Sequence, residues 1–272
     1  MLTSMLLSAC GGQGGPSTGT DAVLAAQGQA SAAGHSATVL TGGYGLTQTN
    51  LGTDFVSFIW TLNGVTQWMA LYMPTPNTAS YPPVLYRGVV SLQTQGTASA
   101  VITSFDKQYQ LRTGSAAVTA ASGEGYQMAL RGVDLSDAGS GIQFTATALA
   151  TSADINRDWN GTWADAGPGG SIKTSARLSV QNGKGNTDFG NCDLGLSLAQ
   201  EGTAKPYFLA SAALASASGK VCPRAPSSGA QTTLMGVAFI HDTVVGSSAE
   251  KRLEIMLTDP YGSGISFRGT QQ

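Results

Sequence analysis

Residues 171–180 read SIKTSARLSV, and this stretch decides the fold class because its apolar and polar residues alternate. Ile172, Leu178 and Val180 fall on one side of an extended chain, whereas Lys173 and Arg177 fall on the other. A period of two is typical of a β-strand with one buried face, since successive side chains point to opposite faces. The stretch therefore predicts a half-buried strand.

The same alternation recurs along the chain. DLGLSLAQ (193–200) has its leucines on one side, and RLEIMLTD (252–259) turns Arg252 and Glu254 away from its apolar side. Turn sequences such as Asn63-Gly64 and Asn182-Gly183 separate these runs, and long helical periodicity is absent. Many short strands with glycine-rich turns predict an all-β fold, an antiparallel β-barrel or sandwich.

A short sequence repeat indicates two related β units. Gly139–Phe144 reads GSGIQF, and 123 residues later Gly262–Phe267 reads GSGISF. Each copy follows an alternating strand and an Asp-containing turn, so we expect one unit at 37–150 and a second at 157–272, each ending in the same hairpin. A single larger sheet system with two similar hairpins is the alternative.

Composition limits the functions that the chain can have. Lys plus Arg number 14, Asp plus Glu 16, and only 11% of residues are charged. Binding to nucleic acid needs clustered cations, so this composition argues against it. No run of about 18 apolar residues occurs, and we expect any membrane attachment to be covalent or peripheral.

The N-terminus carries Leu7-Ser8-Ala9-Cys10, which resembles the bacterial lipobox. The resemblance implies that 1–9 is a signal peptide, that the chain is cut before Cys10, and that this thiol carries lipid such as palmitate. A usual signal peptide has a basic start and a longer apolar part. Neither precedes Cys10, and we expect the true start codon to lie further upstream.

Residues 10–36 are interpreted as the lipidated cysteine and a flexible tether. Residues 11–36 are rich in Gly, Ser, Ala and Gln, a composition that cannot bury enough apolar surface to become ordered. Gly11 is not the aspartate that commonly retains lipoproteins in the inner membrane. The resemblance therefore implies the outer membrane of a Gram-negative bacterium, with the protein facing the periplasm or the surface.

Cys192 and Cys222 remain once Cys10 is assigned to lipid. An even pair in an oxidising compartment predicts a disulfide. Two free thiols or a metal site are the alternatives, but the two histidines of the chain, His35 and His241, are not at ligand spacing from a cysteine.

The segment 154–165 is the best candidate for a metal site. Asp154, Asn156 and Asp158 place oxygen ligands at alternate positions, as in a calcium loop, but Trp159 occupies the sixth place, where the helix-loop-helix motif needs glycine. Asn and Asp also fill ordinary turns. We favour a linker turn, and no cofactor is expected.

Gly161-Thr162-Trp163 resembles the G-x-W element that opens the first strand of lipocalins and related calycin barrels. The resemblance implies a barrel closed at one end by Trp163, and a carrier would hold an apolar ligand against Trp159 and Trp163. Two tryptophans in an ordinary β core are the alternative.

Ser122–Tyr126, SGEGY, resembles the S-G-x-x-Y loop of periplasmic lysozyme inhibitors, although the partner motif of that family is missing and a hairpin turn is the simpler interpretation. Phe58, Trp60, Trp68 and Tyr72 flank Asn63-Gly64 and could face a ligand or partner, with core packing as the default.

No G-x-S-x-G, P-loop or H-E-x-x-H motif occurs, and His241 and Asp242 should point to opposite faces of a strand. We therefore expect no enzyme. The expected protein is a lipoprotein that binds a protein or envelope partner without catalysis. The alternatives are a carrier of a small apolar ligand and an inhibitor of a lysozyme-type hydrolase. The oligomeric state is left open.

Overall fold

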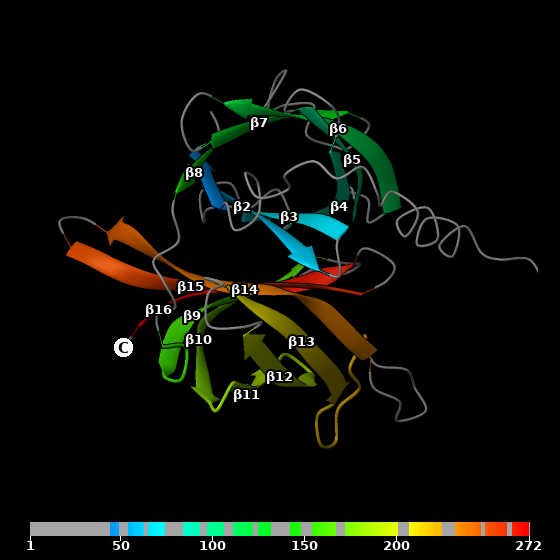
Figure 1. The fold of residues 1–272 in the computed structure, drawn as a ribbon. Coiled ribbons are helices and arrows are strands. Elements are labelled where there is room, and N and C mark those ends of the chain that lie inside the picture. The colour runs from blue at the N-terminus through cyan, green and yellow to red at the C-terminus, as the bar shows by residue number, and fades with distance from the viewer. Residues whose placement is uncertain are drawn as a thin grey trace, which may run out of the picture.

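A computed structural model gives the fold as two closed β-barrels, each with eight antiparallel strands in sequential order (Figure 1). It describes residues 44–48, 54–62, 65–73, 84–92, 97–105, 111–121, 125–131, 142–147, 154–166, 172–200, 207–224, 232–245, 248–259 and 263–271. The predicted all-β, antiparallel barrel fold is confirmed. Among these residues no helix is long and apolar enough to span a bilayer.

The first barrel is closed by pairing of its first and last strands, in which Tyr44 lies opposite Thr147. Its strands are β1 (Tyr44–Gln48), β2 (Asp54–Leu62), β3 (Val65–Met73), β4 (Val84–Leu92), β5 (Thr97–Phe105), β6 (Leu111–Ala121), β7 (Gly125–Arg131) and β8 (Ile142–Thr147).

The second barrel is closed in the same way, with Trp163 opposite Phe267. Its strands are β9 (Asp158–Ala166), β10 (Ile172–Gln181), β11 (Lys184–Phe189), β12 (Cys192–Gln200), β13 (Tyr207–Ser216), β14 (Thr232–Val245), β15 (Ser248–Thr258) and β16 (Gly264–Gln271). The Asn182-Gly183 turn joins β10 to β11 with positive φ at both residues, as a two-residue hairpin loop requires.

The repeated sequence occupies equivalent places in the two barrels. Ile142 opens β8, and Gly264 and Ile265 open β16, so both copies begin the last strand of a barrel. The barrels span 44–147 and 158–271, inside the units expected at 37–150 and 157–272.

Side chains fill the interior of the second barrel. Its buried apolar cluster draws on every strand from β9 to β16, with leucines 194, 196 and 198 of β12 and Leu253, Ile255 and Leu257 of β15 among its members. An eight-stranded barrel is just wide enough for side chains to fill. The alternating pattern that predicts the strands therefore also supplies this core.

The two barrels pack against each other through a second apolar cluster. Strands β2, β3 and β4 of the first barrel face β14, β15 and β16 of the second (Figure 1). Phe58 contacts both Tyr207 and Phe239, with ring centroids 5.4 and 4.5 Å apart. At Gly264 a Cβ would come within 2.2 Å of Leu85 Cδ2 on β4 and within 2.3 Å of the Leu257 carbonyl oxygen on β15. Because the Leu257 oxygen is a backbone atom and cannot rotate away, glycine is needed here for the close approach of β16 to β15.

The predicted disulfide is confirmed. Cys192 and Cys222 are both buried and bonded, with Cα atoms 4.7 Å apart. The bond ties the start of β12 to the segment that follows β13. It therefore braces two strands that are already paired, with Cys192 opposite Ser216.

Candidate binding groove

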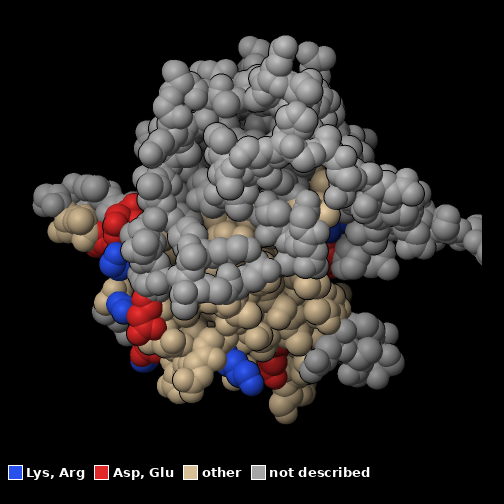
Figure 2. Space-filling view, viewed as in Figure 1, with Lys and Arg blue, Asp and Glu red and all other residues tan. Residues whose placement is uncertain are grey.

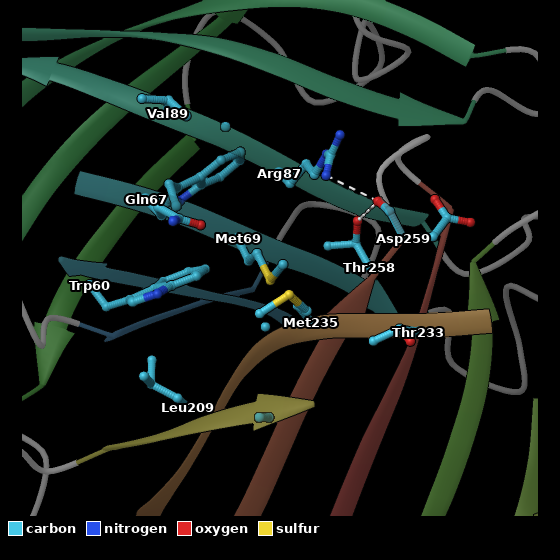
Figure 3. Close-up of a pocket in the computed structure, with 14 residues that line it drawn as sticks. Trp60, Gln67, Met69, Arg87, Val89, Leu209, Thr233, Met235, Thr258 and Asp259 are labelled. Carbon is cyan, nitrogen blue, oxygen red and sulfur yellow. Dashed lines mark hydrogen bonds between the residues drawn. The ribbon is translucent and has the colours of Figure 1, made fainter. Parts of the chain in front are cut away.

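A cavity of about 390 Å³ lies between the two barrels (Figure 3). Its walls come from β2, β3 and β4 on one side and from β13, β14 and β15 on the other. We call this cavity the inter-barrel groove. Its lining residues are Trp60, Gln67, Trp68, Met69, Arg87, Gly88, Val89, Leu209, Ala210, Thr233, Met235, Gly236, Thr258 and Asp259.

Trp60 is the largest side chain on the outward face of the first barrel at the groove. Phe58 and Met69 belong to the apolar cluster between the two barrels, and they lie on the same face of the sheet as Trp60. This face is therefore the outer face of the first barrel. Trp60 is only 2% exposed, and its buried indole Nε1 has no hydrogen-bond partner among the residues that the structure describes. Gln67 lies directly opposite it on β3 and is half-buried.

Met235 forms the opposite rim of the groove. It is 61% exposed, although Val237 and Phe239, which share its face of β14, are fully buried against the first barrel. Figure 3 shows the Met235 and Met69 side chains pointing toward each other across the groove, with Trp60 and Leu209 on one side of them. The middle of the groove is thus lined by thioethers and aromatic or aliphatic carbon.

The other end of the groove is charged. Arg87 Nη1 donates a hydrogen bond to the Asp259 carbonyl oxygen at 3.0 Å, and Thr258 Oγ1 donates to the same oxygen at 2.6 Å (Figure 3). Burial lowers the pKa of Arg87, and the charge of Asp259 offsets part of that shift. One cation and one carboxylate lie here, and the charges of the groove balance.

A buried polar cluster lies on the same outer face of the second barrel. Glu254 is fully buried, its Oε1 accepts a hydrogen bond from Arg268 Nε at 2.8 Å, and His241 Nε2 lies 3.4 Å from Oε1. Burial by itself raises the pKa of Glu254. The charge of Arg268, the hydrogen bond to His241 and the charges of His241 and Arg252 together bring it below its usual value.

Trp159 and Trp163, the residues suggested for an apolar ligand, lie in the interior of the second barrel. Both are 0% exposed. The Trp163 ring packs against Phe267 and Phe189, at centroid distances of 4.9 and 6.1 Å, and Trp159 Nε1 donates to the Ile155 carbonyl oxygen at 3.2 Å. The structure therefore uses both tryptophans as core residues.

The residues suggested for a metal ion have other partners. Asp154 Oδ1 accepts from the Asn156 backbone N–H at 2.9 Å, Asn156 Oδ1 accepts from the Gly183 N–H at 2.8 Å, and Asp158 pairs with Arg177. These contacts are those of a turn leading into β9. In the described part of the chain no cluster of three or more His, Cys, Asp or Glu side chains could hold a metal ion.

Gly161-Thr162-Trp163 lies in β9, the first strand of the second barrel in chain order. A Cβ on Gly161 would meet the Arg268 carbonyl oxygen at 2.0 Å, so the neighbouring strand approaches this glycine closely. Of the lysozyme-inhibitor pattern, Ser122 lies outside the described residues and Tyr126 lies in β7. Cys10 and the tether also lie outside them.

His241 and Asp242 point to opposite faces, as expected: His241 is buried beside Glu254, and Asp242 is exposed and pairs with Lys251 at 3.1 Å. The remaining charged residues in view are few and lie mostly near the edges of the second barrel (Figure 2). Among the described residues that this view colours, acidic and basic side chains lie next to one another.

Comparison of the chain with models of known protein families, with curated proteins and with solved structures finds no match.

Proposed function

We propose that this chain is a lipid-anchored protein of the bacterial outer membrane that binds a protein partner without catalysis. The inter-barrel groove is the proposed binding site. The observation that carries this proposal is the exposed rim of an otherwise buried apolar interface, where Met235 remains 61% exposed beside a cavity of about 390 Å³. A largely apolar cavity with a few polar groups, such as this groove, is the default candidate for a binding site.

Closure of both barrels supports recognition through side chains. A partner that adds a strand needs a sheet edge with unpaired backbone groups, and in each barrel the first strand pairs with the last. The groove instead offers side chains from both barrels. Recognition therefore depends on the shape and chemistry of the groove.

A carrier of a small apolar molecule is the competing function. The packed interior of the second barrel argues against a ligand inside that barrel, because tryptophan, leucine and phenylalanine side chains occupy the space. A small apolar ligand would have to occupy the inter-barrel groove instead.

Two experiments test the proposal. Cells fed labelled palmitate should label the natural protein and leave the Cys10→Ala variant unlabelled and released from the membrane fraction. If the natural protein is not labelled, the proposed lipid anchor at Cys10 is rejected.

For the groove, a photo-reactive amino acid in place of Met235 should give a discrete protein adduct in intact cells. The control carries the same amino acid in place of Val221, the other large apolar residue that is strongly exposed within the described part. The groove is rejected as the site if position 235 gives no protein adduct, or only the adducts seen at 221.

A further inference from the structure

We propose that the inter-barrel groove recognises a tyrosine side chain presented by the protein partner. This inference rests on the proposed function and names the chemistry of its ligand. It starts from the buried Trp60 indole, the two methionines and the charge balance of the groove.

The unpartnered Trp60 N–H indicates that the ligand carries a hydrogen-bond acceptor. Trp60 is 2% exposed and lines the groove, yet its Nε1 has no partner among the described atoms. A buried donor without a partner is costly, and an acceptor brought by a ligand would recover that cost. Gln67, directly opposite on β3, adds an amide that can both donate and accept.

The two methionines indicate that the ligand is aromatic. Met69 and Met235 point toward each other from opposite walls (Figure 3), and thioether sulfur makes favourable contacts with the edges of aromatic rings. Met69 is 4% exposed, whereas Met235 is 61% exposed and unbranched, so Met235 is the side chain that moves to admit a ring.

The charge balance indicates that the ligand is neutral. Arg87 and Asp259 contribute one positive and one negative charge at the far end. An anionic headgroup or a cationic side chain would gain attraction from one of them and repulsion from the other. A neutral ring with a polar tip meets no such conflict.

These conditions distinguish among the aromatic side chains. The phenylalanine ring has no acceptor, and the indole of tryptophan is a donor only, so neither can pair with the Trp60 N–H. The neutral imidazole of histidine has an acceptor, but it takes up a proton close to neutral pH and the resulting cation meets the charge of Arg87. The phenol of tyrosine can accept from Trp60 and donate to the Gln67 carbonyl oxygen. A partner's protein surface, rather than a free phenol, is favoured because the exposed Met235 rim provides further contact area outside the cavity.

The test uses the full, oxidised chain and nuclear magnetic resonance of its tryptophan indole N–H groups and methionine methyl groups. The probes are N-acetyl-tyrosinamide, N-acetyl-phenylalaninamide, N-acetyl-tryptophanamide and N-acetyl-leucinamide. We expect the tyrosine probe to shift the Trp60 indole signal and the Met69 and Met235 methyl signals to saturation. Its Kd should be about fivefold below that of the phenylalanine probe, the effect of one neutral hydrogen bond.

Trp60→Phe assigns the indole signal and should abolish the preference for tyrosine over phenylalanine while leaving the methyl shifts. Met235→Lys should weaken every probe, and Val221→Lys, its exposed counterpart, should weaken none. If Trp60→Phe does not fold, the indole shift in the natural protein and the comparison of Met235→Lys with Val221→Lys still test the inference.

Equal affinity for the tyrosine and phenylalanine probes overturns the inference, as does binding that leaves the Trp60 indole signal unmoved or no binding at all. Such a result leaves the photo-crosslinking result at position 235 as the separate criterion for the proposed function. A protein adduct at position 235 without a preference for the tyrosine probe would support the groove as the protein-binding site and reject tyrosine as the side chain that it recognises.

Discussion

The rings of Phe58 in the first barrel and Phe239 in the second stack with centroids 4.5 Å apart and planes 15° apart. Both residues are fully buried, and each lies on the outer face of its own barrel. The outer surfaces of two barrels thus form a common core. The inter-barrel groove lies beside this stack. The packing of the two barrels against each other therefore determines the shape of the proposed site.

Phe58→Ala should lower the free energy of unfolding by about 3–5 kcal/mol, because it removes a large buried ring from a packed interface. A double-mutant cycle with Phe239→Ala should give a coupling of about 1 kcal/mol, as expected for an aromatic pair. Urea unfolding followed by fluorescence measures both quantities. The control cycle pairs Phe58 with Phe189, which belongs to the interior cluster of the second barrel and should add independently. Additive losses for Phe58 and Phe239 would contradict direct stacking of the two rings.

Reduction of the disulfide should destabilise the second barrel by about 3–4 kcal/mol on the chain-entropy account, since the bond closes a loop with a sequence separation of 30 residues. The measurement is the urea midpoint with and without reductant, in a Cys10→Ala background that removes the third thiol. The Cys192→Ser, Cys222→Ser double variant should have the urea midpoint of the reduced protein, and reductant should not change it. An unchanged midpoint on reduction would show that the pairing of β12 with β13 alone constrains this region.

The strands and the disulfide could be predicted from the sequence because each depends on a local pattern or on parity. Alternation in 171–180 identifies β10, and an even number of cysteines after Cys10 identifies the bond. The roles of Trp159 and Trp163 could not be decided, because a tryptophan that lines a ligand cavity and one that fills a core occur in the same strand pattern. Packing against Phe267 decides in favour of the core for Trp163.

The groove and the polar cluster could not be predicted because they depend on contacts between distant strands. Glu254 alternates with apolar neighbours and has the pattern of a solvent-facing residue, yet it is fully buried. Its partners His241 and Arg268 come from β14 and β16, and their outer face turns toward the first barrel. Likewise Met235 and Trp60 are brought to one groove by the packing of the barrels. Only the aromatic pattern around Asn63-Gly64 indicated that Trp60 could face a partner.

Glu254 should make the protein sensitive to acid. Its pKa in the folded state is lowered, so the carboxylate stabilises the fold above the pKa of the unfolded chain, about 4.3. This contribution is lost as the pH falls through the lowered folded-state value. Glu254→Gln should cost about 3–5 kcal/mol near neutral pH, because it removes the carboxylate that accepts from the buried Arg268 Nε.

The measurement for Glu254 is the urea midpoint between neutral pH and pH 3, and the variant should flatten its acid slope. Asp188→Asn is the control, because its pair with Lys173 is exposed and should contribute little. If the urea midpoints of the natural protein and of Glu254→Gln fall in parallel as the pH is lowered, the buried cluster is not the cause of the acid sensitivity.

Gly161→Ala should be among the most damaging small substitutions in the second barrel. The new Cβ would lie 2.0 Å from the Arg268 carbonyl oxygen and 2.5 Å from the Gly269 Cα, and a backbone atom cannot rotate away as a side chain can. Because β9 pairs with β16 to close the barrel, relieving the contact means opening the closure. We expect a loss of more than about 3 kcal/mol, or failure to fold.

The matched control for Gly161 is Gly195→Ala on β12, where the nearest atom to the new Cβ, Asn186 Oδ1, lies at 3.7 Å. That change should alter stability by no more than about 1 kcal/mol. Circular dichroism and amide hydrogen exchange of β9 and β16 make the comparison. If the two alanine variants are equally stable, β16 does not approach β9 at Gly161 as closely as these distances require.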